Sequence, residues 1–205
     1  MDTKSRILQT AFNLFLEKGF ASVSLNEVIK ASDITTGGFY YHFDSKDSLM
    51  VAVIEKYIFN YFNSTIEQIK NFQGDPQEKL KRVVLTLVGA DLNTSKQTEI
   101  MENSTGIDYR VLHILLIEGV HKYNIIKEHY MKFYYNLLEF NKEIIAEGIS
   151  QGVIRNDADP TELALMTQSV MIGTIMMWVV MPTIPLEQIM TSNINQLWDH
   201  LKYVH

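Results

Sequence analysis

Apolar residues recur every three to four positions along almost the whole chain, and no segment shows the sustained alternation of a β-strand. Near the N-terminus Ile7, Ala11 and Phe15 lie four residues apart, which places them on one face of a helix. Leu8 and Phe12 widen that face. The pattern predicts an all-α fold of nine or ten helices, without internal repeats.

Start and stop residues divide this pattern into helices. Ser24, with Glu27 three residues later, has the form of a capping box, and Gly19 is expected to end the helix before it. Asn124 is expected to interrupt a helical run and Gly152 to close one. The predicted N-caps are Ser24, Thr35 or Thr36, Ser45, Asp75 and Asp159. The longer helices are predicted at about 46–72, 125–151, 160–181 and from Pro185 to near Tyr203.

One stretch, "TGGFYYHF" at residues 36–43, departs from ordinary core composition because two glycines precede five ring-bearing side chains. Glycine lowers helix stability by about 1 kcal/mol relative to alanine. Phe39 and Phe43 lie four residues apart, so we expect both to face the core. A core role does not explain Gly37 and Gly38, which predict a surface that another molecule approaches closely.

The first three predicted helices have the proportions of a helix-turn-helix, with a four-residue turn between the second and the third. Residues 36–38 then form the exposed first turn of the third helix, where the backbone can approach a DNA edge or a phosphate. Hydroxyl, imidazole and ammonium groups follow along the same surface and can donate to phosphate oxygens. These expected phosphate donors are Tyr40, Tyr41, His42 and Lys46.

On these residues the chain resembles the DNA-binding domain of TetR-type transcriptional regulators. The resemblance runs through "ILQTAFNLFLEKGFASVSLNEVIKASDITTGGFYYHFDSKDSLMVAVIE", with its Phe-x-x-x-Gly-Phe entry and its Tyr-Tyr-His-Phe-x-Ser-Lys run. It implies that the third helix reads the major groove, while its tyrosine and the following lysine hold the DNA backbone. Thr36 stands where the family often has lysine, which leaves base preference open. By resemblance these roles fall on Thr35, Thr36, Gly37, Gly38, Tyr40, Tyr41, His42 and Lys46.

The resemblance also implies the organisation of the whole chain. A helix-turn-helix DNA-binding domain is expected at residues 1–46, and a helical ligand-binding and dimerisation domain at residues 47–205. The implied function is a cytoplasmic, ligand-responsive regulator, a repressor, that binds a pseudo-palindromic DNA operator as a homodimer. A small-molecule effector would release it from the operator.

Residues 163–186 contain 24 positions without a charge, which is long enough to span a bilayer. The stretch also holds glutamine, serine and threonines, ends at two prolines and lacks a basic flank. A helix buried by its own core and by a partner subunit explains it better, and by resemblance it pairs with the helix at 125–151 across a two-fold axis. The predicted dimer-interface residues are Ile144, Ile145, Met166, Val170, Gly173 and Met177.

A ligand pocket is expected among aromatic and methionine side chains of the middle helices. The segment "HYMKFYYNLLEF" from His129 places four apolar residues on one helical stripe, although such a stripe is more often plain core. An apolar or aromatic effector of modest size, neutral or singly charged, suits this composition. The candidate residues are His113, Glu118, Tyr130, Phe133, Tyr134, Leu137, Met177 and Trp178.

Composition limits the kinds of functional site that the protein can have. The 205 residues include no cysteine and carry a net charge of −6, and residues 1–50 are not basic either, so DNA binding must come from local geometry. The N-terminus has no apolar signal region. His113, His121 and His129 recur every eight residues, off a common helical face, and we expect no metal, cofactor or catalytic site. Two alternatives stay open: a helical enzyme or binding module with an incidental helix-turn-helix, and a membrane-anchored protein.

Overall fold

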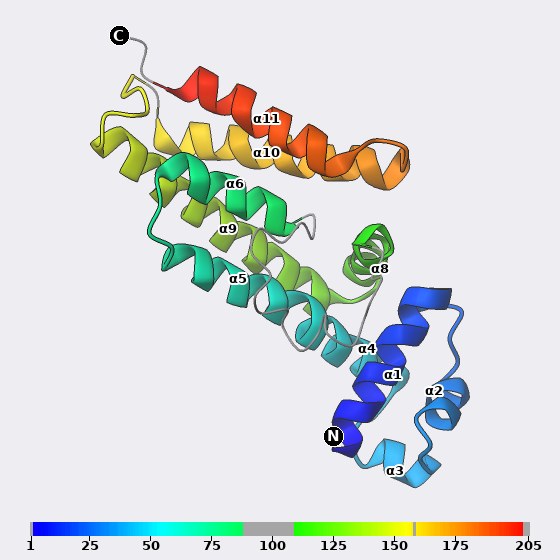
Figure 1. Ribbon diagram of the computed structural model, residues 1–205. Coiled ribbons are helices and arrows are strands. Elements are labelled where there is room, and N and C mark those ends of the chain that lie inside the picture. Colours follow the sequence, from blue (N-terminus) through cyan, green and yellow to red (C-terminus); the bar gives the residue numbers. More distant parts are fainter. Residues whose placement is uncertain (1, 88–108, 158, 203–205) are drawn as a thin grey trace. The chain divides into compact units, whose positions relative to one another are not determined.

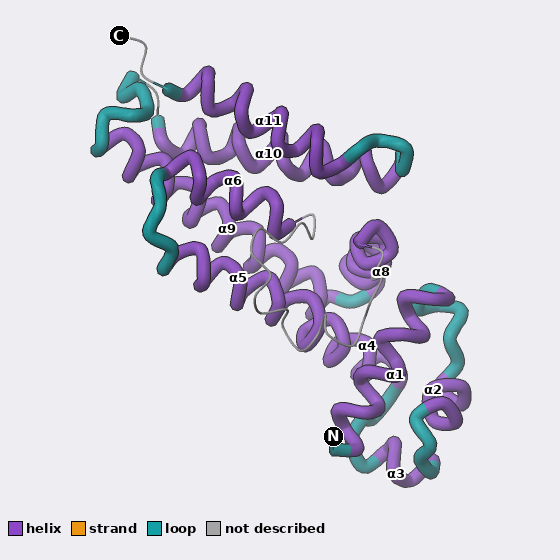
Figure 2. Tube along the Cα trace, viewed as in Figure 1, coloured by secondary structure: helices purple, strands orange, loops and turns teal. Residues whose placement is uncertain are grey.

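The computed structural model describes residues 2–87, 109–157 and 159–202, and these residues are almost entirely helical (Figures 1 and 2). The predicted all-α fold is confirmed: the only β feature in the described ranges is an isolated bridge between Ile154 and Lys202. The elements are α1 (Thr3–Lys18), α2 (Leu25–Ala31), α3 (Thr36–Tyr40), α4 (Lys46–Ile54), the π-helix η1 (Glu55–Phe59), α5 (Asn60–Lys70), α6 (Pro76–Leu87), α8 (Tyr109–Lys122), α9 (Asn124–Ser150), α10 (Pro160–Val180) and α11 (Leu186–Leu201).

The chain divides into two compact units. Unit 1 comprises residues 1–61 and 97–130, and unit 2 comprises residues 62–96 and 131–205. The domain boundary expected at residue 46 falls inside unit 1, because α4 and η1 pack with the N-terminal helices. Tyr57 of η1 stacks on Phe12 of α1 at a centroid distance of 4.4 Å, and its hydroxyl donates to Gln9 Oε1 at 3.1 Å.

The core of unit 1 is aromatic. Phe12, Phe15 and Phe20 are buried, together with the rest of the α1 face that the helical period predicts. Phe39 and Phe43, expected to face inward, are also buried, at 0% and 5% exposure, and their ring centroids lie 5.7 Å apart. Phe39 and Phe43 thus contribute rings to the core of unit 1, whereas α2 contributes the aliphatic Val28 and Ile29.

Side-chain caps start the short helices where the sequence predicts. Ser24 Oγ accepts from the Glu27 amide at 3.2 Å, but the Glu27 carboxylate bonds to the Lys18 ammonium at 2.5 Å, so only half of the predicted capping box forms. Thr35 caps α3, and Ser45 caps α4 in a capping box with Ser48. In unit 2, Asp75 and Asp159 cap α6 and α10 as predicted.

The helical run predicted at about 46–72 is present but is not a single α-helix. It passes from α4 through the five-residue π-helix η1 into α5, which ends at Lys70. The Asn60 amide donates to the Glu55 carbonyl, five residues back, which is the π-helical pattern. The other long helices agree with prediction to within two residues where the structure describes their ends; Tyr203 lies outside the described residues.

Unit 2 is a stack of helices in which α11 packs against both α6 and α10 (Figure 1). The Lys79 ammonium of α6 bonds to the Glu147 carboxylate of α9 at 2.7 Å. The Gln168 amide of α10 donates to the backbone carbonyl of Tyr134 on α9 at 3.1 Å. These polar contacts fix α6 and α10 on α9, around a core that includes Leu137, which has no exposed surface.

α10 is the one described helix that is long and apolar enough to cross a membrane by length and composition. Core helices of soluble proteins meet the same criterion, so this finding alone is weak evidence for a span. Its most apolar 18-residue window is 39% buried inside the chain, which leaves much of an apolar surface uncovered. The helix therefore requires a second explanation besides the core of unit 2.

Asp33, in the turn between α2 and α3, is the one described non-glycine residue with a positive φ, at 51°. A Cβ in this left-handed conformation costs about 1–2 kcal/mol, and β-branched residues tolerate it least. We expect Asp33→Val to lower the free energy of unfolding by about 1–2 kcal/mol in urea titrations, and Asp33→Gly to leave it unchanged or raise it. Equal stability of the two variants would contradict the conformation of this turn.

Candidate nucleic-acid interface

The turn and the start of α3 form an exposed edge of unit 1. Thr35, Thr36 and Gly37 are exposed, and Gly38 is half-buried. Thr35 Oγ1 accepts from the Gly38 amide at 3.0 Å, which fixes the first turn of a helix only five residues long. On the other side of the same helix Phe39 is fully buried, so the inner face of α3 is packed in the core of unit 1.

Neither backbone conformation nor internal packing requires glycine at position 37. Among the described glycines only Gly19 and Gly152 have positive φ, and a Cβ built on Gly37 meets no atom within 4 Å. A Cβ on Gly38 would meet Thr35 Oγ1 at 3.3 Å, so there the N-cap itself favours a small residue. Gly37 therefore leaves its own helix without a side chain at a point where no described residue fills the space.

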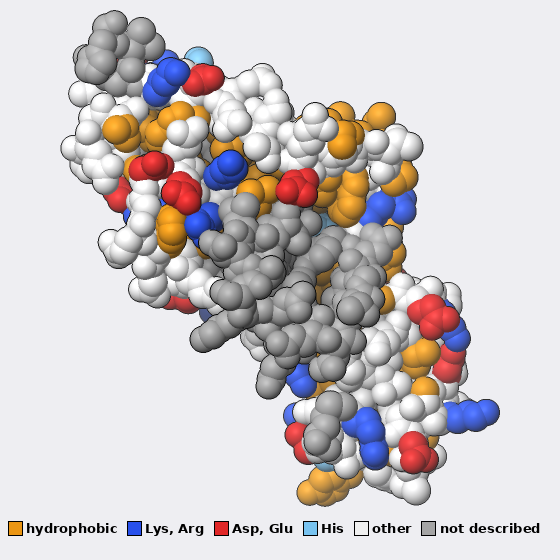
Figure 3. Space-filling view, viewed as in Figure 1, with side chains coloured by type: hydrophobic (Ala, Val, Ile, Leu, Met, Phe, Trp, Pro, Cys, Tyr) orange, Lys and Arg blue, Asp and Glu red, His pale blue; other side chains and the backbone are white. Residues whose placement is uncertain are grey.

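Tyr40 and Tyr41 place their rings on the surface next to this edge, at 52% and 84% exposure. Tyr40 packs edge-on against Phe39, and Tyr41 packs edge-on against the half-buried His42, with centroid distances of 5.4 and 4.9 Å. Hydrophobic side chains, among which tyrosine is counted, protrude beside α3 in Figure 3. The structure thus places these predicted residues on the surface of one unit. Exposed tyrosine hydroxyls can donate to phosphate oxygens.

Lys46 differs from the other predicted donors because its ammonium points inward. It donates to the backbone carbonyl of Phe20 at 2.6 Å and lies 4.2 Å from the centroid of the Phe20 ring. Burial lowers the pKa of the Lys46 ammonium, and the nearby Lys122 lowers it further. No local pattern around Lys46 indicates this arrangement, because Phe20 lies 26 residues earlier in the chain.

The sequence also gave no sign of Lys4, whose ammonium lies 5.8 Å from the centroid of the Phe43 ring, beside the end of α3. Lys18, in contrast, is paired with Glu27. Mixed positive and negative side chains cover unit 1 in Figure 3, in agreement with a domain that has no basic excess. Any DNA contact here depends on shape and on neutral hydrogen-bond donors as much as on charge.

Residues 7–53 match the family model described as "Bacterial regulatory proteins, tetR family". The match begins inside α1 and ends in α4, and it includes the exposed edge at Gly37. Over these residues the chain belongs to the TetR family.

The chain is 30% identical over 101 residues to the HTH-type transcriptional regulator AcrR of Shigella flexneri. It is 29% identical over 79 residues to the HTH-type transcriptional repressor NemR of Escherichia coli K12. These alignments cover 49% and 38% of this chain, and 47% and 40% of the two relatives, so the chain spans less than half of their length. Both relatives are transcriptional regulators by name.

The fold extends beyond the matched region. A transcriptional regulator from Saccharomonospora viridis, solved in complex with choline, superposes with a TM-score of 0.75 at 20% identity over 98% of each chain. At this identity the likeness shows the fold alone, and it confirms the expected arrangement of an N-terminal helix-turn-helix followed by a helical domain.

The effector residues predicted for this TetR-family chain fall in both units. His113, Glu118 and Tyr130 belong to unit 1, and the other five, from Phe133 to Trp178, belong to unit 2. His113, Phe133 and Leu137 are buried; Met177 is 55% exposed; the remaining four are half-buried. Inside unit 2 the rings of Phe133 and Tyr134 meet edge to face at 5.3 Å. No group of three metal-ligating side chains occurs in the part of the chain that the structure describes.

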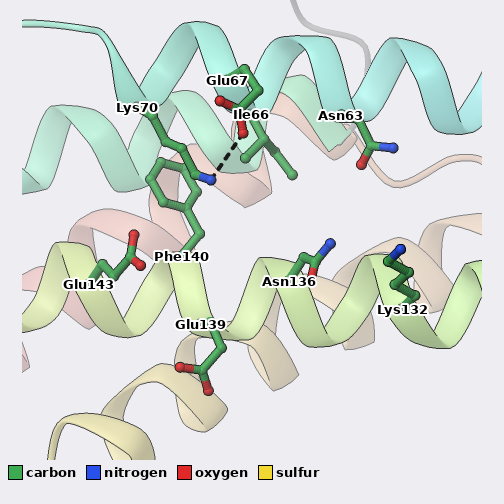
Figure 4. A pocket seen from close by; sticks show the side chains of 9 residues that line it. All are labelled: Asn63, Ile66, Glu67, Lys70, Lys132, Asn136, Glu139, Phe140 and Glu143. Carbon is green, nitrogen blue, oxygen red and sulfur yellow. Dashed lines mark hydrogen bonds and ion pairs between the residues drawn. The ribbon is translucent and has the colours of Figure 1, made fainter.

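A groove of about 420 Å³ lies between α5 and α9 in unit 2 (Figure 4). Its floor is apolar, with Ile66 and Phe140, and the Lys70 ammonium bonds to Glu67 at 3.0 Å above the Phe140 ring. The rim carries charges of both signs, so this groove is not the apolar pocket that the sequence predicts. Its lining is Asn63, Ile66, Glu67, Lys70, Lys132, Asn136, Glu139, Phe140 and Glu143.

The six predicted dimer residues separate by exposure. Ile144 and Ile145 are 2% and 0% exposed inside unit 2, so these two side chains have no surface to offer a partner. Their apolar character reflects the core of the protomer. Met166 and Val170 are half-buried on α10, whereas Gly173 and Met177 are exposed.

Proposed function

We propose that this TetR-family protein is a transcriptional regulator that binds a DNA operator through the exposed edge at the start of α3. The observation that carries the proposal is Gly37, a helical glycine that neither its φ angle nor any neighbouring atom requires. An approaching base edge or phosphate explains the missing side chain, because it would occupy the space that a Cβ takes.

The neighbouring side chains fit the same role. Tyr40, Tyr41 and His42 follow the edge and can donate hydrogen bonds to phosphates on either side of a groove. Thr35 and Thr36 carry hydroxyls that can reach base edges. Since the protein acts on DNA in this proposal, we place it in the cytoplasm, and by analogy with the named repressor NemR we propose that it represses.

We further propose that two copies join through the exposed face of α10. Three apolar side chains of this helix are exposed: Leu165 at 49%, Met177 at 55% and Val180 at 78%. Gly173 lies between them, and a Cβ at this position would meet no described atom within 4 Å. Hydrophobic side chains gather where α10 passes into α11 in Figure 3. An apolar face with a small residue at its centre suits close packing against the same helix of a second copy. A dimer would present two α3 edges to a pseudo-palindromic operator.

The effector that we propose is small, neutral and mainly apolar. The buried polar side chains among the described residues are serine, threonine, histidine, asparagine and glutamine, without a charged group to neutralise a buried ion. Asn141 on α9 is fully buried, and within the described structure neither its Nδ2 nor its Oδ1 has a hydrogen-bond partner. A ligand that both donates and accepts a hydrogen bond would satisfy this amide.

The DNA-binding proposal predicts that Gly37→Leu loses specific operator binding but keeps its stability. The melting temperature of the variant should be at least as high as that of the wild type, because replacing Gly by Leu in a helix adds up to about 1 kcal/mol of helix stability. Its affinity for an operator selected by the wild type from random duplexes should fall to the non-specific level, about 10³-fold or more weaker. Ala146→Leu, an exposed position on α9, is the control for added bulk. Unchanged operator affinity in Gly37→Leu would refute the recognition edge.

The dimer proposal predicts that Gly173→Arg folds but does not associate, because the protomer leaves room for the side chain and a partner does not. Sedimentation velocity without detergent should show a wild-type dimer and a folded monomer for the variant, with Gln68→Arg, at an exposed position on α5, still dimeric. A wild-type monomer with full operator affinity would contradict the proposal. Failure to extract the wild type without detergent would instead favour the membrane alternative.

The effector proposal predicts selectivity for neutral compounds. In thermal-shift assays, neutral aromatic amides such as benzamide should raise the melting temperature and release the operator, whereas nucleotides should not. Asn141→Leu should keep the fold, because replacing an unpaired buried amide by an apolar group of similar shape costs little. It should lose the response to benzamide. Release by a nucleotide, with no response to any apolar compound, would contradict the effector class.

A further inference from the structure

The ring of Phe20, in the turn after α1, is the centre of a cluster that joins three separate parts of unit 1. Its edge-to-face neighbours are Phe15 at 5.2 Å and Tyr123 at 5.7 Å. The ammonium groups of Lys46 and Lys122 lie 4.2 and 5.0 Å from its centroid. We call this set, with Asp47, the Phe20 junction: Phe15, Phe20, Lys46, Asp47, Lys122 and Tyr123.

Lys46 connects the first turn of α4 to the turn after α1 in two ways. The hydrogen bond from its ammonium to the Phe20 carbonyl, at 2.6 Å, is charge-assisted, and the position over the Phe20 ring adds a cation–π contact. A lysine that reached outward to a DNA phosphate would lose both contacts. The Phe20 carbonyl would then lose the side-chain donor that the structure gives it.

Tyr123 makes the third connection. It is the single residue between α8 and α9, and its hydroxyl donates to Asp47 Oδ1 at 2.8 Å. Burial and the Asp47 carboxylate both raise the pKa of Tyr123, so the hydroxyl keeps its proton and remains a donor. The turn between α8 and α9 is thereby tied to the residue next to Lys46, and through Phe20 to the end of α1.

We infer that Lys46 and Tyr123 are positioning residues: through Phe20 and Asp47 they hold the helix-turn-helix against α4 and the α8–α9 turn, and Lys46 does not contact DNA. The inference rests on the proposed DNA binding and concerns how the exposed edge at the start of α3 is oriented. It departs from the expectation, carried by family resemblance, that Lys46 binds a phosphate.

Salt dependence separates the two roles of Lys46. A lysine that neutralises one phosphate contributes about 0.9 to the slope of log K against log salt, and a positioning lysine contributes nothing. We expect Lys46→Met, which keeps the apolar stem, to weaken operator binding by roughly tenfold with an unchanged slope. Lys56→Met is the matched control, because Lys56, like Lys46, lies over an aromatic ring, 5.3 Å from the Tyr57 centroid, but outside the junction.

A second measurement separates positioning from loss of stability. Positioning variants should lower the ratio of operator to non-specific affinity, whereas partial unfolding lowers both affinities together. Tyr123→Phe should lower this ratio several-fold, and Asp47→Leu should do the same. Asp47→Asn should retain the wild-type ratio, because an amide oxygen still accepts from the Tyr123 hydroxyl. The effects of Lys46→Met and Tyr123→Phe should be less than additive, since both act through Phe20.

A slope reduced by about 0.9 in Lys46→Met, with equal losses on operator and non-specific duplexes, would overturn the inference and restore the phosphate contact. Wild-type behaviour in both Lys46→Met and Tyr123→Phe would overturn it as well. If Lys46→Met does not fold, the ratio in Tyr123→Phe and the Asp47 pair decides alone. A wild-type protein that selects no operator would refute the proposed function itself, which is a distinguishable result.

Discussion

Helices as short as α2 and α3 are not stable by themselves in water. The exposed edge at the start of α3 therefore depends on the aromatic core of unit 1. Phe12, Phe15 and Phe20 from α1 and its following turn are buried with Phe39 and Phe43 from the region of α3. Burying rings of this size supplies the stability that seven and five helical residues lack. Because α3 packs against the core through its inner side, its outer side needs no side chain for stability. A glycine at position 37 is therefore tolerated.

Local signals were predictable from the sequence because they act over three or four residues. The caps at Thr35, Ser45, Asp75 and Asp159 appear where they were expected, and so does the inward direction of Phe39 and Phe43. The proposed DNA edge was also predicted this way, because glycines in a helix lower its stability and no nearby residue compensates for the loss. These features are encoded within one turn of helix, so no tertiary information is needed to find them.

Other features depend on contacts between distant residues, and the sequence could not supply them. From the sequence alone Lys46 is expected to be a surface cation. In the structure its ammonium donates to the backbone carbonyl of Phe20, 26 residues earlier. Ile144 and Ile145 have the composition of an interface but are buried by their own protomer. The apolar run in α10 is compatible with a core, a partner or a membrane, because composition does not say which molecule covers an apolar face. The π-helical turn at η1 likewise has no local sequence signature.

The central claim is that the edge beginning at Gly37 enters the major groove, and dimethyl sulfate protection of the bound operator tests it most directly. This reagent methylates guanine N7 in the major groove and adenine N3 in the minor groove, so it reports which groove is occupied. The account predicts protected guanine N7 atoms in two symmetric half-sites, about 34–36 Å or more apart, with adenine N3 still reactive between them. Protection confined to adenine N3, or a single unsymmetric patch, would contradict it.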